Sequence, residues 1–188
     1  IISLLHLQND KITDGNLKAA IVESQSRIGS IALIHQNLYQ NDRLDTIRLN
    51  EFIINLNKQL DDFYKKPDHQ IILETCIKHS TVDIDTAVPL GLILNELFSN
   101  THKHAFKNTS QIKVTILLEE ISKGAYKLVF HDNGPGLSDE GLFLNAQTLG
   151  LELIRGLAKQ LHGEAVYQYK EGSEFTIFFK DSITRKSS

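Results

Sequence analysis

The stretch that most constrains the fold is residues 89–106, PLGLILNELFSNTHKHAF. At about 3.6 residues per turn, it predicts a helix with one apolar arc and one polar edge. The arc consists of Leu90, Ile93, Leu94, Leu97, Thr101 and Ala105. Glu96, Asn100 and Lys103 follow one another along the edge, so a carboxylate, a carboxamide and an ammonium can face one small cavity. Such a set suits a hard cation and a phosphate, although a solvated edge of an ordinary amphipathic helix is the simpler alternative.

Length and charge limit the function classes. The 188 residues can bury one full core and a second, smaller unit. Because the net charge is -3 and no basic run with interleaved aromatic residues occurs, we expect no nucleic-acid partner. No apolar run is long enough to cross a bilayer, so we expect no membrane contact. The single cysteine, Cys76, cannot form an internal disulfide; it fits the cytoplasm, and we expect it in the core.

Residues 1–40 predict a helical hairpin with a broad apolar face. The heptad positions of its second helix are Leu17, Ile21, Ser24, Ile28, Ile31, His35 and Leu38, and the face is widened by Ala20, Ala32 and Ile34. Two helices bury such a face poorly, whereas two hairpins from two chains form a four-helix bundle, so we predict a homodimer through residues 1–40. The alternative is a hairpin that packs on its own C-terminal domain. His6 and His35 are interpreted as packed or hydrogen-bonded residues rather than as ligands or nucleophiles.

The remaining sequence predicts a second domain of mixed helices and strands. Residues 41–48 are polar and without period, so we expect a dimerisation domain at residues 1–45 and a second domain at residues 46–188. The predicted helices span residues 49–66, 89–106 and 151–162, and the predicted strands span residues 70–77, 111–118, 125–132, 164–169 and 173–179. A cap at residues 83–86 would place Pro89 in the first turn of the central helix.

The strand at residues 125–132 places a carboxylate on its apolar face. Asp132 follows the alternation of Tyr126, Leu128 and Phe130, and a carboxylate on a buried face needs a donor, for which a ligand is a candidate. The glycine turn at residues 133–136 then permits close approach of a ligand. Residues 138–147 are a candidate lid, and the glycine at the start of the next helix lets backbone N–H groups meet an anion.

Four short motifs occur in a fixed order: NELFSNTHKH at residues 95–104, DNGPGL at 132–137, TLGLEL at 148–153 and GSEF at 172–175. In this order and spacing they resemble the N, G1, G2 and G3 boxes of the histidine-kinase and gyrase-type ATPase superfamily. The segment at residues 23–39 resembles the second dimerisation helix of a bacterial sensor histidine kinase family. The resemblance implies the α+β class: a helical hairpin, half of a dimeric four-helix bundle, followed by an α/β sandwich that holds ATP between its helices and its mixed sheet.

The resemblance also implies roles for individual residues. Asp132 matches the aspartate that accepts a hydrogen bond from the adenine amino group. Asn100 matches the magnesium-binding asparagine, Glu96 lies beside it at the metal and its water shell, and Lys103 joins them as a catalytic residue. The other implied nucleotide-binding residues are His104, Gly134, Gly136, Leu149, Gly150, Leu151, Gly172 and Ser173, with Lys103 and His104 near the phosphates.

A protein of this family would move the γ-phosphoryl group of Mg-ATP to a histidine on the bundle. It would then pass the group to an aspartate on a response-regulator receiver domain. His6 does not match the HRxKNN-like phosphoacceptor motif, which we expect to lie before residue 1, so residues 1–188 should bind ATP or ADP without autophosphorylation. Two alternatives stay open: an ATPase or serine kinase of the same superfamily that forms no phosphohistidine, and a non-catalytic dimeric scaffold with a degenerate nucleotide site.

Overall fold

The computed structural model describes residues 14–40, 46–64, 69–77, 81–106, 109–137, 143 and 148–181. Its helices are α2 (Gly15–Gln40), α3 (Leu49–Tyr64), α4 (Ile84–Asn100), the π-helix η1 (Thr101–Ala105) and α6 (Leu149–Gln160). Its strands are β1 (Thr46–Arg48), β2 (Gln70–Ile77), β3 (Thr81–Asp83), β4 (Gln111–Ser122), β5 (Ala125–Asp132), β6 (Glu164–Tyr169) and β7 (Ser173–Lys180). The strands predicted at residues 70–77, 125–132 and 164–169 therefore have the predicted bounds.

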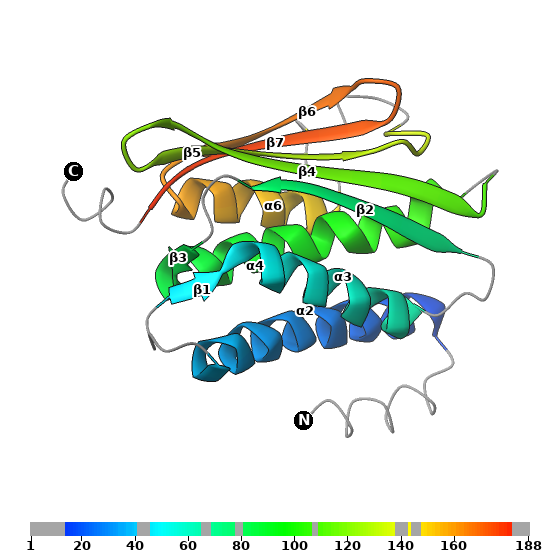
Figure 1. The fold of residues 1–188 in the computed structure, drawn as a ribbon. Helices are drawn as coiled ribbons and strands as arrows, with labels where there is room; N and C mark the ends of the chain where they lie inside the picture. Colours follow the sequence, from blue (N-terminus) through cyan, green and yellow to red (C-terminus); the bar gives the residue numbers. More distant parts are fainter. Residues whose placement is uncertain are drawn as a thin grey trace.

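The described elements form three layers. A five-stranded sheet lies on one side, α3, α4 and α6 cover one of its faces, and α2 lies outside these helices (Figure 1). A separate two-stranded sheet pairs β1 with β3. None of the helices in the described ranges is both long and apolar enough to span a membrane. This arrangement confirms the predicted α+β class with an α/β sandwich.

The sheet brings the ends of distant strands together. Its strand order is β2-β4-β5-β7-β6, with β2 parallel to β4 and the other neighbours antiparallel. In this register Asp132, at the end of β5, lies between Val114 of β4 and Ser173 of β7. Two of the sequence motifs, at residues 132–137 and 172–175, therefore meet at one end of the sheet.

Helix α4 fills the centre of the core. All members of the predicted apolar arc are buried, and Phe98 of α4 packs edge-on against Phe130 of β5 with ring centroids 5.1 Å apart. The Asp83 side chain caps the helix by accepting a hydrogen bond of 3.0 Å from the Thr86 N–H. Because this cap starts the helix at Ile84, Pro89 lies in the second turn, and the prediction of the first turn is wrong.

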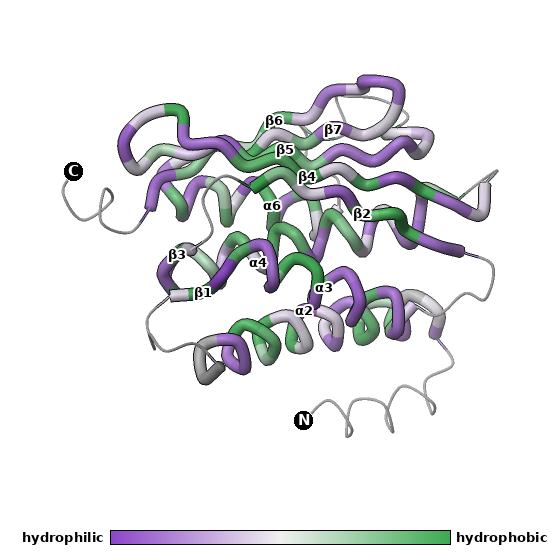
Figure 2. Tube along the Cα trace, viewed as in Figure 1, coloured by the Kyte–Doolittle hydropathy of each residue, from purple (hydrophilic) through white to green (hydrophobic). Residues whose placement is uncertain are grey.

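Helix α2 packs on α3 and α4, which is the alternative that the sequence left open for the hairpin. The residues that it buries include Ser26, Ser30 and Ile34, whereas the heptad residues Leu17 and Ile31 are 52% and 44% exposed. Figure 2 shows polar and apolar residues intermixed along α2. Small hydroxyl side chains allow close approach of the helices, so the polar face of α2 docks and much of its apolar stripe stays outside.

Other predictions are wrong or fall outside the described residues. Cys76 is exposed, because β2 is an edge strand whose alternate residues face away from the helices. His35 is exposed, which leaves the hydrogen-bonded form of its predicted structural role. The predicted first helix, His6 and the boundary at residues 41–45 lie outside the described residues. Of the predicted lid, only Phe143 is described; it is buried and packs against Phe175 with ring centroids 5.5 Å apart.

Candidate functional site

A cavity of about 420 Å³ lies between the C-terminal end of α4, the sheet and the start of α6. Its wall draws on all four sequence motifs. The contributing residues are Asn100 and His104 from the first motif, Asp132 and Gly136 from the second, Thr148 and Leu151 from the third, and Ser173 and Phe175 from the fourth. Segments separated by more than seventy residues therefore build one concave site of a size typical of small-molecule pockets.

The Asp132 carboxylate is the most distinctive group in this wall. It is 5% exposed and accepts hydrogen bonds from the Thr101 hydroxyl at 3.1 Å and from the Gly134 N–H at 2.9 Å. Burial raises the pKa of the Asp132 carboxyl above its usual value, and these hydrogen bonds oppose the shift. Neither Lys nor Arg is among the described residues that line the cavity, so the carboxylate faces it without an adjacent fixed cation.

The segment after Asn100 widens into a single π-helical turn. The Thr101 hydroxyl oxygen also lies 3.2 Å from the Leu97 carbonyl oxygen, so its single proton is shared between that carbonyl and the Asp132 carboxylate, a contact that competes with regular helical pairing. The turn places Thr101, His104 and Ala105 on the cavity wall together with Asn100. Such π turns are rare and often occur at functional sites. The helical pattern of the sequence did not predict this π turn, and apart from this threonine no signal in the sequence points to it.

Two glycines shape the wall through positive φ angles. Gly136 has φ 71° and lines the cavity, and a Cβ there would lie 2.9 Å from the Tyr167 hydroxyl oxygen. Gly172 has φ 150°, and a Cβ there would overlap the Asp132 carbonyl oxygen. Larger residues would therefore move the strand end that carries Asp132.

Several predicted site residues do not line the cavity. Gly134, Leu149, Gly150 and Gly172 adjoin wall residues in sequence but are not part of the wall. A Cβ on Gly150 would lie 2.9 Å from the Glu96 Oε2, so this glycine leaves room for that carboxylate. Glu96 and Lys103 are also outside the wall.

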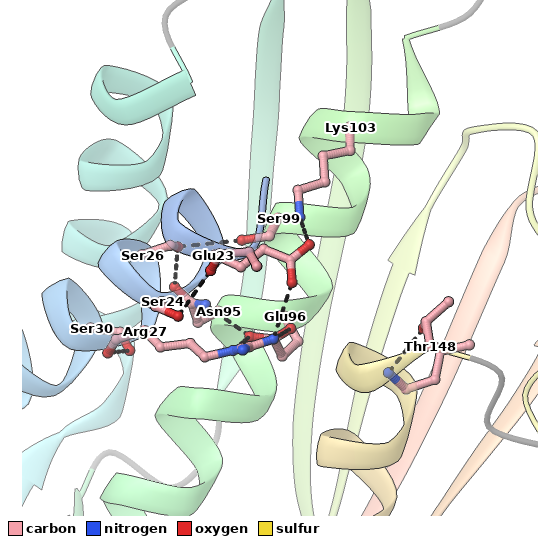
Figure 3. A network of polar contacts seen from close by, with 12 residues as sticks. Glu23, Ser24, Ser26, Arg27, Ser30, Asn95, Glu96, Ser99, Lys103 and Thr148 are labelled. Carbon is pink, nitrogen blue, oxygen red and sulfur yellow. Dashed lines mark hydrogen bonds and ion pairs between the residues drawn. The ribbon is translucent and has the colours of Figure 1, made fainter. Parts of the chain in front are cut away.

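The side chains of Glu96 and Lys103 contact α2 instead (Figure 3). Arg27 of α2 donates from Nε to Glu96 Oε1 at 2.8 Å and from Nη2 to Glu96 Oε2 at 2.9 Å. Lys103 donates from Nζ to Glu23 Oε1 of α2 at 2.6 Å. The polar edge of the central helix is therefore divided: Asn100 faces the cavity, and its two charged neighbours face α2. Glu23 and Arg27 had no predicted role, although their i, i+4 spacing places them on one helix face.

The donor set near the cavity fits a magnesium ion only in part. Asn100 supplies a hard carboxamide oxygen, but no group of three or more His, Cys, Asp or Glu suited to a metal occurs among the described residues. Both oxygens of Glu96 already accept from Arg27. Since Mg²⁺ often keeps several waters and binds substrate phosphates with few protein ligands, Asn100 fits an ion that arrives with a nucleotide.

Comparison with known proteins agrees with this architecture. The sequence model of the histidine kinase-, DNA gyrase B-, and HSP90-like ATPase family matches residues 85–183. The chain belongs to this ATPase family. A histidine kinase family model also matches residues 1–64, so α2 falls in the histidine kinase part. Together the two matches show a sensor histidine kinase core.

Curated relatives align with most of this chain. The chain is 27% identical over 157 residues to the sensor histidine kinase PdtaS of Mycobacterium tuberculosis, covering 84% of this chain and 31% of the relative. It is 22% identical over 169 residues to blue-light-activated histidine kinase 2 of Erythrobacter litoralis, covering 87% of this chain and 47% of the relative. The chain thus spans about a third to a half of the length of these kinases.

Solved structures share the fold of this histidine kinase core. The histidine kinase domain of a blue-light activated histidine kinase from Erythrobacter litoralis superposes with a TM-score of 0.73 at 18% identity, covering 98% of this chain and 85% of that chain. The mycobacterial sensor histidine kinase MprB superposes with a TM-score of 0.59 at 19% identity, covering 73% of this chain and 97% of that chain.

Proposed function

We propose that this chain binds Mg-ATP as the core of a sensor histidine kinase whose γ-phosphoryl transfer to a histidine feeds a response-regulator aspartate. One observation carries the proposal: a buried carboxylate, Asp132, faces a cavity that all four ATPase motifs line. Family membership and the histidine kinase match at residues 1–64 support the same function.

Asp132 recognises the adenine base. Gly134 and Thr101 each donate to one oxygen of its carboxylate, and the remaining lone pairs can accept from the adenine amino group. A buried carboxylate without a fixed cation gains from such a donor, because desolvation has already removed its water. Ser173, its register neighbour on β7, adds a hydroxyl to the same wall.

Asn100 and His104 lie on the wall at the end of α4, where the phosphates extend. The Asn100 carboxamide is the protein ligand for magnesium, which supplies charge neutralisation to the phosphates when it is bound. The N-terminal turn of α6, where the Thr148 hydroxyl accepts from the Leu151 N–H, adjoins the cavity, and the first backbone N–H groups of this helix can bind an anion. These residues bind and orient the nucleotide, and positioning is the main source of rate in phosphoryl transfer.

The apolar stripe of α2 supports a homodimer through residues 1–40. Leu17 and Ile31 are exposed on the part of α2 that the structure describes, and Ala20 and Ala32 extend the stripe between and beside them. A second copy of the hairpin would cover this stripe in a four-helix bundle. The docked face shares only Ile34 with the named residues of this stripe, so docking leaves Leu17, Ala20, Ile31 and Ala32 exposed.

The chemical stability of the phosphorylated product tests the proposal. The full-length protein is incubated with γ-labelled ATP and magnesium, and the labelled protein is treated with acid or with alkali. Label that acid removes and alkali preserves indicates phosphohistidine. Acid-stable label would instead support a serine kinase, and a protein that neither gains label nor consumes ATP would support the scaffold alternative.

A further inference from the structure

Four charged side chains form one continuous network between α2 and the end of α4 (Figure 3). Lys103 contacts Glu23 at 2.6 Å, Glu23 contacts Arg27 at 3.5 Å, and Arg27 contacts Glu96 at 2.8 Å. The charges alternate in sign along this chain, so each group has an opposite partner. Partners from the two helices are 69 and 80 residues apart in sequence, so the network fixes α2 against α4.

Neutral contacts hold the helices together at the same level. The Ser26 hydroxyl donates to Asn95 Oδ1 at 2.8 Å and lies 3.5 Å from the Ser99 hydroxyl oxygen. Ser26, Asn95 and Ser99 are all at least 97% buried. Because these buried hydrogen bonds join specific residues of the two helices, they favour one register of α2 on α4, and Glu23 lies beside Lys103 in that register.

A triphosphate gains from a cation beside its terminal phosphate. The described lining of the cavity holds one carboxylate, Asp132, and neither Lys nor Arg. Lys103 is the residue between cavity and network: it directly precedes His104, which lines the cavity, yet its ammonium binds Glu23. A lysine stem is long and flexible, so the same ammonium can reach a phosphate once Glu23 is removed.

We propose that docked α2 weakens binding of the terminal phosphate of a nucleoside triphosphate, because Glu23 holds the Lys103 ammonium away from the cavity. Undocking of α2 frees the ammonium, so any signal that moves α2 changes the preference for triphosphate over diphosphate. The inference rests on the proposed nucleotide site and adds a residue, Glu23, that sets its phosphate specificity. Lys103 cannot bind both anions at once, so Glu23 and the phosphate compete for it.

The test compares diphosphate and triphosphate affinity in matched variants. The 188-residue chain is titrated calorimetrically with ADP and with a non-hydrolysable ATP analogue, both with magnesium. The variants are Glu23→Gln, the control Glu74→Gln, Lys103→Gln, and the double variant Glu23→Gln/Lys103→Gln. Glu74 pairs with Lys113 at 2.8 Å on the sheet, so its change removes the same charge far from α2. Both glutamates are partly exposed, with side chains 31% and 55% accessible, so neither change opens the core.

We expect Glu23→Gln to improve the affinity for the analogue relative to ADP by about two- to fivefold, the range for a single partly exposed charge pair. Glu74→Gln leaves the ratio unchanged, and the gain disappears in the Lys103→Gln background. The inference is overturned if Glu23→Gln keeps the wild-type ratio of analogue affinity to ADP affinity, or if the gain persists in the Lys103→Gln background. ADP binding by these variants would still uphold the proposed function. Loss of ADP binding in every variant, wild type included, overturns both.

Discussion

The hydroxyl of Thr101 donates a hydrogen bond of 3.1 Å to the Asp132 carboxylate, which lies 31 residues further along the chain. This bond joins the π turn after α4 to the end of β5, and it orients the carboxylate that we assign to adenine. Both residues are almost completely buried, with 1% and 5% of their surface exposed. The geometry of the cavity therefore depends on a polar contact inside the core.

Replacing Thr101 with valine tests the importance of this contact. The shape is conserved, but the buried carboxylate loses a donor, so we expect the free energy of unfolding to fall by about 1–3 kcal/mol. Urea denaturation of both proteins measures the change. Thr115 on β4, which is half-buried and lies outside the cavity wall, provides a matched Thr→Val control. Equal effects at the two positions would contradict the special role of the Thr101 hydroxyl.

Asp132→Asn separates the stability cost of the carboxylate from its proposed function. Since burial raises the pKa of Asp132, its charge disfavours the folded state at neutral pH. The carboxamide keeps an oxygen for the Gly134 N–H, so we expect the variant to be as stable as the wild type or more stable. Thermal unfolding without nucleotide measures this, and a large loss of stability would show that the carboxylate is needed for the fold.

The raised pKa of Asp132 also predicts how stability depends on pH. Between the ordinary aspartate pKa and the higher folded value, the folded chain holds a proton that the unfolded chain has lost. Stability contributed by Asp132 is therefore fully present below the ordinary pKa and is lost as pH rises through the folded pKa. Urea titrations of wild type and Asp132→Asn at stepped pH should diverge in this direction, the variant gaining relative to wild type as pH rises. Parallel curves would refute the assignment.

Arg27→Gln should destabilise the chain, because it leaves the Glu96 carboxylate, 5% exposed, without its bidentate partner. We expect a loss of about 3 kcal/mol, as for other buried pairs that lose one member. Arg48 is the matched control: it pairs with Glu51 at 3.0 Å, and both side chains are more than half exposed. Arg48→Gln should cost less than about 1 kcal/mol. Similar losses in the two variants would mean that the contact between α2 and α4 contributes little.

A reversible tether tests whether α2 must move during activity. The Ser26 and Ser99 hydroxyl oxygens lie 3.5 Å apart, so cysteines at both positions are suited to form a disulfide. Cys76, which is exposed, is replaced by serine to prevent other disulfides. In the full-length protein we expect oxidation to reduce ATP-dependent phosphorylation and reductant to restore it. Equal phosphorylation in the tethered and reduced forms would show that α2 works while docked.

The sequence predicted those features that depend on local patterns. Asp132 falls on the apolar face because side chains alternate along a strand, and the structure buries it as predicted. The arc from Leu90 to Ala105 is buried because helical spacing is equally local. The order and spacing of the four motifs then predicted one site that contains Asn100, Asp132 and Ser173. All three residues line the cavity.

Features that depend on distant partners could not be predicted. The docked face of α2 is polar, and only the position of Glu96 and Lys103 on another helix gives Glu23 and Arg27 their partners. The apolar stripe was the stronger local signal, so the sequence predicted that this other face of α2 packs against a partner. Cys76 was placed in the core because a sequence pattern does not reveal that β2 is an edge strand.

The central claim is that Asp132 binds the adenine of a nucleotide in the cavity. Calorimetric titration of wild type and Asp132→Asn with ADP, with and without magnesium, tests it most directly. In the variant the Gly134 N–H retains the single oxygen, so an amide group would meet the adenine amino group, donor against donor. We expect saturable binding by the wild type that magnesium strengthens, and binding at least about a hundredfold weaker in the folded variant. Equal binding by both proteins, or none by the folded wild type, would contradict it.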